Sequence, residues 1–402
     1  MTTSTDVTWD PFDTEIDADP YPTWRRLRDE APVYRNDRFD FWALSRFDDV
    51  EAAHKDPETF SSAHGTVLEL MSPNRLGDGG GGSSIIFMDP PEHSQLRALV
   101  SRAFTPRRVR ELEVRIRELC AELFGGLEGL DSFDYVENFA ARLPAEVIAS
   151  LLGVPEQDRE FARTHIDLVF HIEPGVGMIN DTSLRAQITL FEYLGAQLAE
   201  RRRQPRDDML TGLVEAEITD ERGERRRLNE REATAFANLL ISAGTETVAR
   251  LLGNFAVVLA AHPDQRRALA ADVSLVPGAV EELLRFEAPS PVQGRWTTRA
   301  VELHGVSIPA GSKVLLLTGS AGRDERKFAD PDRFDIHRAI DHHLSFGYGI
   351  HFCLGAALAR LEGRVGIEET LRRFPDWTVD LAQGKRLHTS TVRGWSNVPF
   401  RP

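Results

Sequence analysis

The segment Phe346–Gly355 reads FGYGIHFCLG and holds one of only two cysteines among the 402 residues. Three glycines accompany this cysteine, Cys353, and the run AALARLEGRVGIEE that follows has the composition of a helix. A thiolate is stabilised by a nearby metal or cation, or by the positive end of a helix dipole. The segment therefore indicates either a functional thiolate on a tight turn or a buried cysteine in a glycine-rich loop.

The overall composition is that of an ordinary globular protein, with 41% hydrophobic and 28% charged residues. The net charge is 48 − 63 = −15, which argues against nucleic acid as a partner because phosphate binding requires a basic surface. We see neither a secretory signal nor an apolar run long enough to span a membrane. With only two cysteines, we expect a cytoplasmic protein without a disulfide framework, and a single domain over residues 1–402.

The strongest helix signal covers Asn229–His262. Asn229 is a good N-cap, Glu232 follows at capping-box spacing, and Pro263 ends the pattern. Such a helix would be roughly 45 to 50 Å long, enough to cross a domain of this size. We expect it to be the central helix of the fold.

Other periodic segments are also mostly helical. Apolar residues recur at helical spacing over Thr105–Leu127 and place Cys120 on the apolar face, so we expect a core thiol without chemistry. Short strands are expected over Val301–Leu317, broken at Gly305 and at Pro309–Gly311. The sequence therefore predicts a mainly α fold with a small β portion.

One glycine-rich run satisfies the G-x-G-x-x-G pattern formally, through Gly77, Gly79 and Gly82. A dinucleotide site would require a strand directly before this run and a helix directly after it. The flanking residues favour neither, so we interpret the run as a surface loop.

The segment around Cys353 closely resembles the cysteine-ligand loop of the cytochrome P450 family, F-G-x-G-x-H-x-C-x-G, at every fixed position. The resemblance implies the P450 fold, with haem b lying between the long central helix and this loop. Cys353 would be the axial thiolate ligand of the haem iron. Phe346 would pack near the thiolate, His351 would reach a haem propionate, and Gly355 would allow close approach of the backbone.

A second motif lies inside the predicted central helix. The family's A-G-x-[DE]-T oxygen-activation motif is matched by Ala243, Gly244, Glu246 and Thr247. By this resemblance, Thr247 assists oxygen activation through its hydroxyl and Glu246 belongs to a proton relay. Without the resemblance, the threonine would be expected to bond back to the helix and the glutamate to face water.

The segment VEELLRF contains Glu282 and Arg285 on one helical face. A surface ion pair is one interpretation. In the resembling family E-x-x-R is a buried structural network near the cysteine loop, and we carry that role to these two residues. The network is expected to include a further arginine, either Arg333 or Arg338, and the sequence leaves both open.

Four residues are candidates for holding haem propionates. His93 and Arg97 are four residues apart, which alone would suggest only a solvated helical face. The resemblance implies that these two, with Arg295 and His351, bind the two carboxylates of the haem.

The function implied is a haem-thiolate monooxygenase that inserts one atom of O₂ into a hydrophobic small molecule. Without a flavin domain, the chain would need a separate ferredoxin and an NAD(P)H-dependent ferredoxin reductase. Arg102, Arg107, Arg108 and Arg364 are candidates for docking these donors.

Two alternatives are a peroxygenase or isomerase on the same scaffold and a non-enzymatic haem sensor. Peroxide-using relatives replace the acid and the alcohol of the oxygen-activation motif, whereas Glu246 and Thr247 are both present here. A sensor would be expected to carry a partner domain, and none is seen in the sequence. We expect the substrate pocket to draw on residues Gly65 to Phe87, on Leu240 and Ala243, on Pro291–Val292, and on Thr391–Val392.

Overall fold

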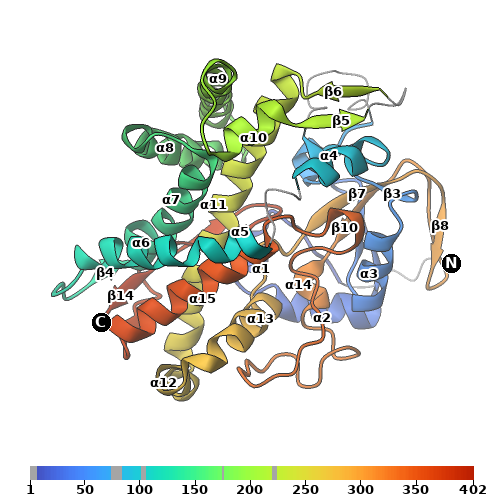
Figure 1. Cartoon of the computed structure of the whole chain (residues 1–402). Helices are drawn as coiled ribbons and strands as arrows, with labels where there is room; N and C mark the ends of the chain where they lie inside the picture. The colour runs from blue at the N-terminus through green and yellow to red at the C-terminus, as the bar shows by residue number, and fades with distance from the viewer. Residues whose placement is uncertain (1–6, 74–83, 101–105, 174–175, 220–223) are drawn as a thin grey trace.

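The structure is a computed structural model that describes residues 7–73, 84–100, 106–173, 176–219 and 224–402. The predictions for Gly77, Gly79, Gly82 and Arg102 fall outside these ranges. Helices form most of the fold (Figure 1). The helices are α1 Thr14–Ala18, α2 Tyr21–Glu30, α3 Phe47–Lys55, α4 Glu92–Val100, α5 Pro106–Glu111, α6 Glu113–Gly125, α7 Arg142–Leu152, α8 Arg159–Val169, α9 Asp181–Arg203, α10 Met209–Glu215, α11 Glu230–Ala261, α12 Pro263–Ala271, α13 Val276–Phe286, α14 Thr318–Ala321 and α15 Ala356–Arg373.

The strands are short and gather mainly into one mixed sheet with the order β1-β2-β10-β7-β3. In this sheet β10 runs parallel to β2 and antiparallel to β7, with Val314 opposite Arg295. The strands are β1 Val33–Asn36, β2 Phe41–Leu44, β3 Phe60–Ser61, β4 Phe133–Asp134, β5 Glu217–Thr219, β6 Arg225–Arg227, β7 Gln293–Thr297, β8 Val301–Leu303, β9 Val306–Ile308, β10 Lys313–Leu316, β11 Thr378–Val379, β12 Lys385–His388, β13 Arg393–Asn397 and β14 Pro399–Arg401.

The predicted central helix is confirmed as α11, whose 32 residues run through the middle of the molecule (Figure 1). The capping box forms: the Asn229 side chain accepts from the backbone N–H of Glu232 at 2.9 Å, and the Glu232 carboxylate accepts from the backbone N–H of Asn229 at 2.8 Å. Helices α7 and α9 pack against α11, as do α13 and α15. Because α11 packs against all four of these helices, it fixes their positions relative to one another.

The expected strand breaks over residues 301–317 are also confirmed. Gly305 has φ +74° between β8 and β9, and Gly311 has φ +77° before β10. Both values lie in the left-handed region that glycine adopts without steric cost. The resulting strand β10 pairs with β7 and fixes the register that carries Arg295.

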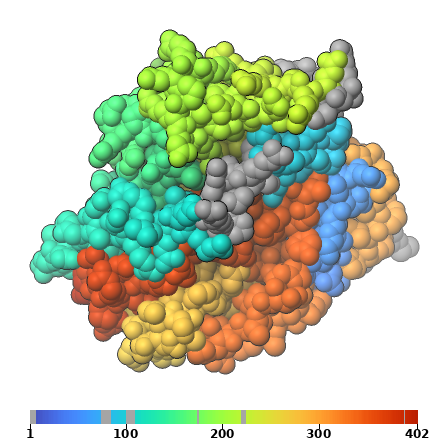
Figure 2. All heavy atoms as spheres, in the orientation of Figure 1, coloured from blue at the N-terminus to red at the C-terminus, as the bar shows by residue number. Residues whose placement is uncertain are grey.

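The helix expected over Thr105–Leu127 is instead two helices, α5 and α6, which meet at Leu112. The backbone N–H of Leu112 bonds to the carbonyl of Val109, three residues back, so the chain tightens there into a 3₁₀-type turn. Helix α6 then lies along α15, and Figure 2 shows the two side by side although they are far apart in the sequence. Periodicity alone does not reveal such a break.

The prediction for Cys120 is confirmed, because its side chain is fully buried in the largest hydrophobic core. Burial raises the pKa of this thiol to about 12, and the charge of Glu369 acts in the same direction. Within the described ranges, no helix combines the length and apolar composition needed to cross a lipid bilayer. The single-domain assignment stays a prediction.

Candidate functional site

The loop before α15 is shaped by two glycines with positive φ, Gly347 at 67° and Gly349 at 66°. A Cβ on Gly349 would lie 2.5 Å from the carbonyl oxygen of His54, so a side chain does not fit there. The backbone N–H of Cys353 then donates to the carbonyl of Phe346 at 2.8 Å. These constraints fix the turn that presents the Cys353 thiol directly before the helix.

The Cys353 thiol lies in a desolvated environment. Burial raises its pKa, while a hydrogen bond from the backbone N–H of Gly355 and the charges of Arg97 and Arg360 lower it. Burial outweighs these contributions, so the thiol by itself favours its neutral form. A metal ion would supply the missing stabilisation of the thiolate. A Cβ built on Gly355 would meet nothing within 4 Å, which leaves the loop open to an approaching group.

Two histidines face each other near this loop, His93 on α4 and His351 within the turn, with ring centroids 4.2 Å apart. Both nitrogens of His93 and Nε2 of His351 are buried and have no hydrogen-bond partner among the described residues. Burial, followed by the charge of Arg97, lowers the pKa of His93 to about 4. Burial, followed by the charge of Arg295, lowers the pKa of His351 to about 2.

Two arginines lie close to these histidines. Arg295 on β7 is buried, donates to the carbonyl of Gly294 at 2.7 Å and approaches Nδ1 of His54 at 3.4 Å. Burial lowers the pKa of Arg295 to about 10 against the opposing charge of Asp89. Arg97 on α4 donates to the carbonyl of Phe352 beside the cysteine. The structure thus brings together all four candidates for propionate binding.

These residues fit a haem with two propionates. The charge of the neighbouring Asp89 carboxylate raises the pKa of His93 and of Arg295, against the effect of burial. Asp89 itself accepts hydrogen bonds from the Ser61 hydroxyl and from the backbone N–H of Ser62. A buried guanidinium requires an anion to compensate its charge, and buried ring nitrogens without partners require a hydrogen-bonding group. A dianionic group whose metal is ligated by the nearby thiolate would meet both requirements.

The segment that matches A-G-x-[DE]-T lies midway along α11. Thr247 Oγ1 donates to the carbonyl of Ala243 at 3.2 Å, and the Glu246 carboxylate pairs with Arg250 at 2.6 Å. Glu246 is only 4% exposed, so it does not face water as a surface glutamate would. A Cβ on Gly244 would lie 3.3 Å from Cγ1 of Ile148, so glycine here accommodates the close packing of α7.

A cavity of about 830 Å³ connects the two groups of candidates. Its walls include Ala243, Glu246 and Thr247 of α11. They also include Arg295 and His351, two of the candidates for propionate binding. The motif of the central helix and the candidates for propionate binding therefore face one common space.

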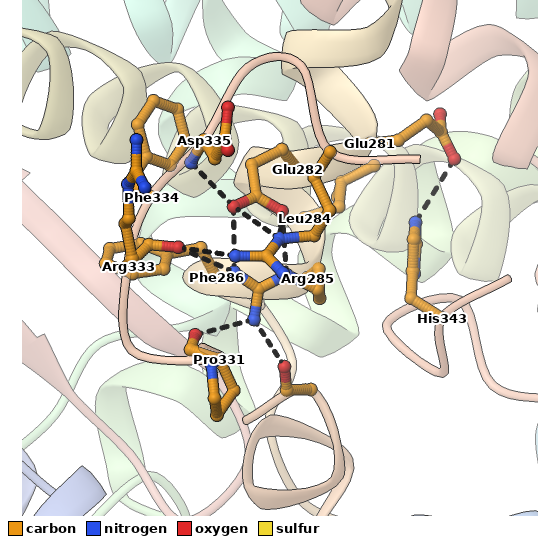
Figure 3. Close-up of polar contacts among 12 residues, drawn as sticks. Glu281, Glu282, Leu284, Arg285, Phe286, Pro331, Arg333, Phe334, Asp335 and His343 are labelled. Carbon is orange, nitrogen blue, oxygen red and sulfur yellow. Dashed lines mark hydrogen bonds and ion pairs between the residues drawn. The ribbon is translucent and has the colours of Figure 1, made fainter. Parts of the chain in front are cut away.

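The E-x-x-R pair, whose contacts Figure 3 shows, is buried. Glu282 and Arg285 form two hydrogen bonds of 2.7 and 2.8 Å, and Arg285 also donates to the carbonyls of Gly322 and Pro331. The guanidinium of Arg338 lies 3.1 Å from Glu282, whereas Arg333 contributes its backbone carbonyl. The arginine side chain that completes this pair is thus that of Arg338.

The same helix, α13, is tied to the cysteine loop. His343 and Arg360 contact the two carboxylate oxygens of Glu281 at 2.7 to 3.2 Å, and the Ser345 hydroxyl donates to the carbonyl of Leu284 at 2.6 Å. Burial would raise the pKa of Glu281, but the hydrogen bonds from His343 and Arg360 hold it at about 2. We call Glu281, Glu282, Arg285 and Arg338, with their partners, the α13 network.

Comparisons with known proteins identify the family. Residues 157–391 match the family model "Cytochrome P450". The chain is 42% identical to "Putative cytochrome P450 123" of Mycobacterium tuberculosis over 392 residues, which cover 97% of this chain and 96% of that protein. The chain belongs to the cytochrome P450 family. In this family a cysteine thiolate holds the haem. Its relatives show that the chain is a P450 monooxygenase.

Two further relatives agree with this P450 assignment. "Vitamin D(3) 25-hydroxylase" of Pseudonocardia autotrophica is 38% identical over 410 residues, 99% of this chain and 98% of that protein. The structure of cytochrome P450 CYP109Q5 from Chondromyces apiculatus superposes with a TM-score of 0.88 at 38% identity and covers 98% of both chains. The predicted P450 fold is thereby confirmed.

Part of the pocket prediction for this P450 is wrong. Leu240 does not line the cavity but lies in a hydrophobic core, and Leu239 lines the cavity in its place. Val292 is also buried in a core, and its neighbours Ser290 and Gln293 face the cavity. The predicted Ala243 and residues 391–392 do line the cavity, as do Thr66, Val67, Leu70, Ser84, Ile86 and Phe87.

Sequence reasoning missed an entire wall of the cavity. Part of that wall comes from α8 and α9 and the segment between them, and part from the N-terminal half of α11. Stepping back from Thr247 by three or four residues reaches Ala243 and Leu239, a signal that would have found the α11 positions. The missed residues are Val169, Phe170, Met178, Ile179, Ser183, Leu184, Gln187, Phe191, Arg231, Ala235, Asn238, Leu239 and Ser242.

The expected docking arginines remain a prediction for this P450. Arg364 on α15 pairs with Glu113 at 2.5 Å and with Glu368 at 3.2 Å, so its charge is already partly compensated. A donor that docks at Arg364 would therefore have to compete with these carboxylates.

Proposed function

We propose that this P450 inserts one atom of O₂ into a hydrophobic small molecule, with electrons from a separate ferredoxin and an NAD(P)H-dependent ferredoxin reductase. The observation that supports this proposal is the common cavity. Ala243 and Thr247 of α11 line it, and so do Arg295 and His351, two of the candidates for propionate binding. The walls are largely apolar, and one relative is named for hydroxylation of vitamin D(3), an apolar alcohol. The cytoplasmic location stays a prediction.

The residues would divide the work of holding the haem. Cys353 would bind the iron through its thiolate, with Phe346 and Gly355 shaping the loop around it. His93, Arg97, Arg295 and His351 would bind the two propionates through charge-assisted hydrogen bonds. When bound, the haem supplies the activation of O₂ and the transfer of oxygen to the substrate.

Thr247 and Glu246 would move protons. The bond from Thr247 Oγ1 to the carbonyl of Ala243 is long at 3.2 Å, so the hydroxyl can turn into the cavity at little cost. Glu246 lines the same cavity and is held by Arg250, which in turn donates to the carbonyl of Trp395. We assign to Glu246, which Arg250 holds in place, the transfer of protons to the Thr247 hydroxyl.

Two measurements test this function. The holoprotein should consume NAD(P)H in the presence of O₂, ferredoxin and reductase only when an apolar substrate is added, and it should release an oxygenated product. The same substrates should be screened first by the low-to-high-spin shift of the iron. Efficient turnover with peroxide alone would favour a peroxygenase instead, and NAD(P)H consumption that no substrate alters would favour a non-enzymatic haem protein.

A further inference from the structure

The N-terminal half of α11 presents a regular row of side chains to the cavity. The spacing of three or four residues places all of them on one helical face. Two of the inner members, Asn238 and Ser242, are polar and lie one turn apart, between the start of the helix and Thr247. The row consists of Arg231, Ala235, Asn238, Leu239, Ser242, Ala243, Glu246 and Thr247.

Both inner polar residues have a buried atom without a hydrogen-bond partner among the described residues, Oδ1 of Asn238 and Oγ of Ser242. Native proteins rarely leave buried polar atoms in this condition unless water or a ligand satisfies them. The two atoms occur at the wall of a cavity large enough for a ligand. They therefore indicate where a bound molecule carries its own polar group.

Other hydroxyls on α11 show that the helix does not impose this arrangement. Thr234 and Thr245 donate to the carbonyls four residues back at 2.7 and 2.8 Å, and Thr247 does so at 3.2 Å. A serine inside a helix can satisfy itself in the same way. Ser242 makes no such bond, so a turn of its side chain can present the hydroxyl to a molecule in the cavity without breaking a hydrogen bond to the described residues.

We propose that Asn238 and Ser242 form a polar anchor that binds a hydroxyl group of an otherwise apolar substrate. The proposal rests on the proposed function, because it names a substrate class for the same cavity. Side chains one helical turn apart have Cβ atoms about 5 to 6 Å apart, so one group between them can reach both. The amide and the hydroxyl both donate and accept, as an alcohol does. Because neither is charged, an ionised substrate group would lose solvation there without compensation.

The anchor also fixes which part of the substrate is oxidised. Ser242 precedes Thr247 by five residues, about 7.5 Å along the helix axis. A rigid substrate held by its hydroxyl at Asn238 and Ser242 would thus present its opposite end near Thr247. We expect oxidation at that remote end rather than next to the anchored hydroxyl.

Spectral titration of the holoprotein tests the anchor with a matched pair of probes, androstane and its ring-A alcohol. These rigid molecules differ only in the hydroxyl. Wild-type protein should bind the alcohol about tenfold more tightly, the factor expected of a net hydrogen bond. Ser242→Ala and Asn238→Leu should each reduce this preference to about twofold or less. If Asn238→Leu does not fold, Ser242→Ala decides alone.

The matched control is Gln187→Leu, which removes a polar side chain from the α9 wall of the same cavity. This variant should keep the tenfold preference. The anchor is wrong if the wild type shows no preference for the alcohol, if Ser242→Ala retains the full preference, or if Gln187→Leu abolishes it equally. The red-shifted ferrous–CO band, recorded for every protein, separates the two proposals: its absence in the wild type contradicts the haem-thiolate function, whereas its presence without an alcohol preference contradicts only the anchor.

Discussion

The α13 network and the α11 wall of the cavity both contain buried polar atoms on helices, but they satisfy them differently. In the network, Glu282 accepts hydrogen bonds from Arg285, from Arg338 and from the backbone N–H of Asp335. On the wall, Asn238 and Ser242 each keep a buried atom without a partner among the described residues. The buried charges of the network thus find partners within the protein, whereas the two atoms on the wall keep their hydrogen-bonding capacity for a ligand.

The difference has an energetic consequence. Removing one member of the network would leave the others as uncompensated buried charges, which strongly destabilises a protein. Removing a polar group from the cavity wall leaves no such charge behind, so it should alter binding or catalysis more than folding. Substitutions in the two regions should therefore separate loss of fold from loss of function.

The largest effect is expected at Cys353, whose loop the network contacts and whose thiol we propose as the haem ligand. Cys353→His should still yield a folded protein, but its ferrous–CO complex should lack the red-shifted band of thiolate ligation and turnover should fall to background. The matched control is Cys120→Ala, because Cys120 is the other cysteine and lies in the core. A red-shifted band in Cys353→His would remove Cys353 from its assigned role.

The network can be tested against a pair with the same E-x-x-R spacing but an exposed glutamate, Glu160 and Arg163, whose charged atoms are 2.7 Å apart. Glu282→Ala should lower the free energy of unfolding by roughly 3 to 5 kcal/mol, since it leaves Arg285 and Arg338 buried without their carboxylate. Glu160→Ala should cost less than about 1 kcal/mol because Glu160 is 69% exposed. Chemical denaturation of both variants measures the contrast, and equal losses would show that burial does not govern it.

This pair also shows what the sequence could predict. The resemblance to the family identifies Glu282 and Arg285 as a buried pair. Glu160 and Arg163 have the same spacing, so the spacing alone does not predict which pair is buried. The same limit left Arg333 and Arg338 undecided, because that choice depends on how a loop folds onto α13. Local signals did better: the capping box at Asn229 depends on residues three apart.

The cavity shows the opposite limit. The cysteine loop and the motif at Thr247 were found because each is a contiguous pattern in the sequence. The wall formed by α8 and α9 was missed, since its residues reach the cavity only through tertiary packing. Leu240 was placed wrongly by a single residue, which on a helix turns a side chain by about 100° and moves it from the cavity to the core.

A smaller functional effect is expected at Thr247, and Thr245 provides the control on the same helix. Thr247 lines the cavity, whereas Thr245 is buried and donates to the carbonyl of Ile241. Thr247→Ala should keep the spin shift on substrate binding but divert most electrons to hydrogen peroxide, because proton delivery fails. Thr245→Ala should remain coupled. The ratio of product to NAD(P)H consumed measures both, and normal coupling in Thr247→Ala would contradict the assignment.

Glu362 on α15 fits neither region. It is buried and does not line the cavity, and yet its Oε2 atom has no partner among the described residues. The side chain is 2% exposed, and burial raises its pKa well above the ordinary value of a glutamate. We therefore expect the carboxyl to avoid a buried charge by staying protonated rather than by binding a ligand. The unfolded chain would release this proton above about pH 4.3.

The folded state consequently binds more protons than the unfolded state between that pH and the raised pKa, so its stability should fall as pH rises through this range. Glu362→Gln removes the proton linkage while keeping the shape of the side chain. Its Tm should exceed that of the wild type at pH 8 by about 2 °C for each kcal/mol gained, and the difference should shrink towards pH 5. Glu160→Gln, at an exposed position, should show no such trend. A Glu362→Gln variant that is less stable than the wild type at every pH would mean that the carboxyl is ionised and paired, and that Glu362 obeys the rule of the α13 network after all.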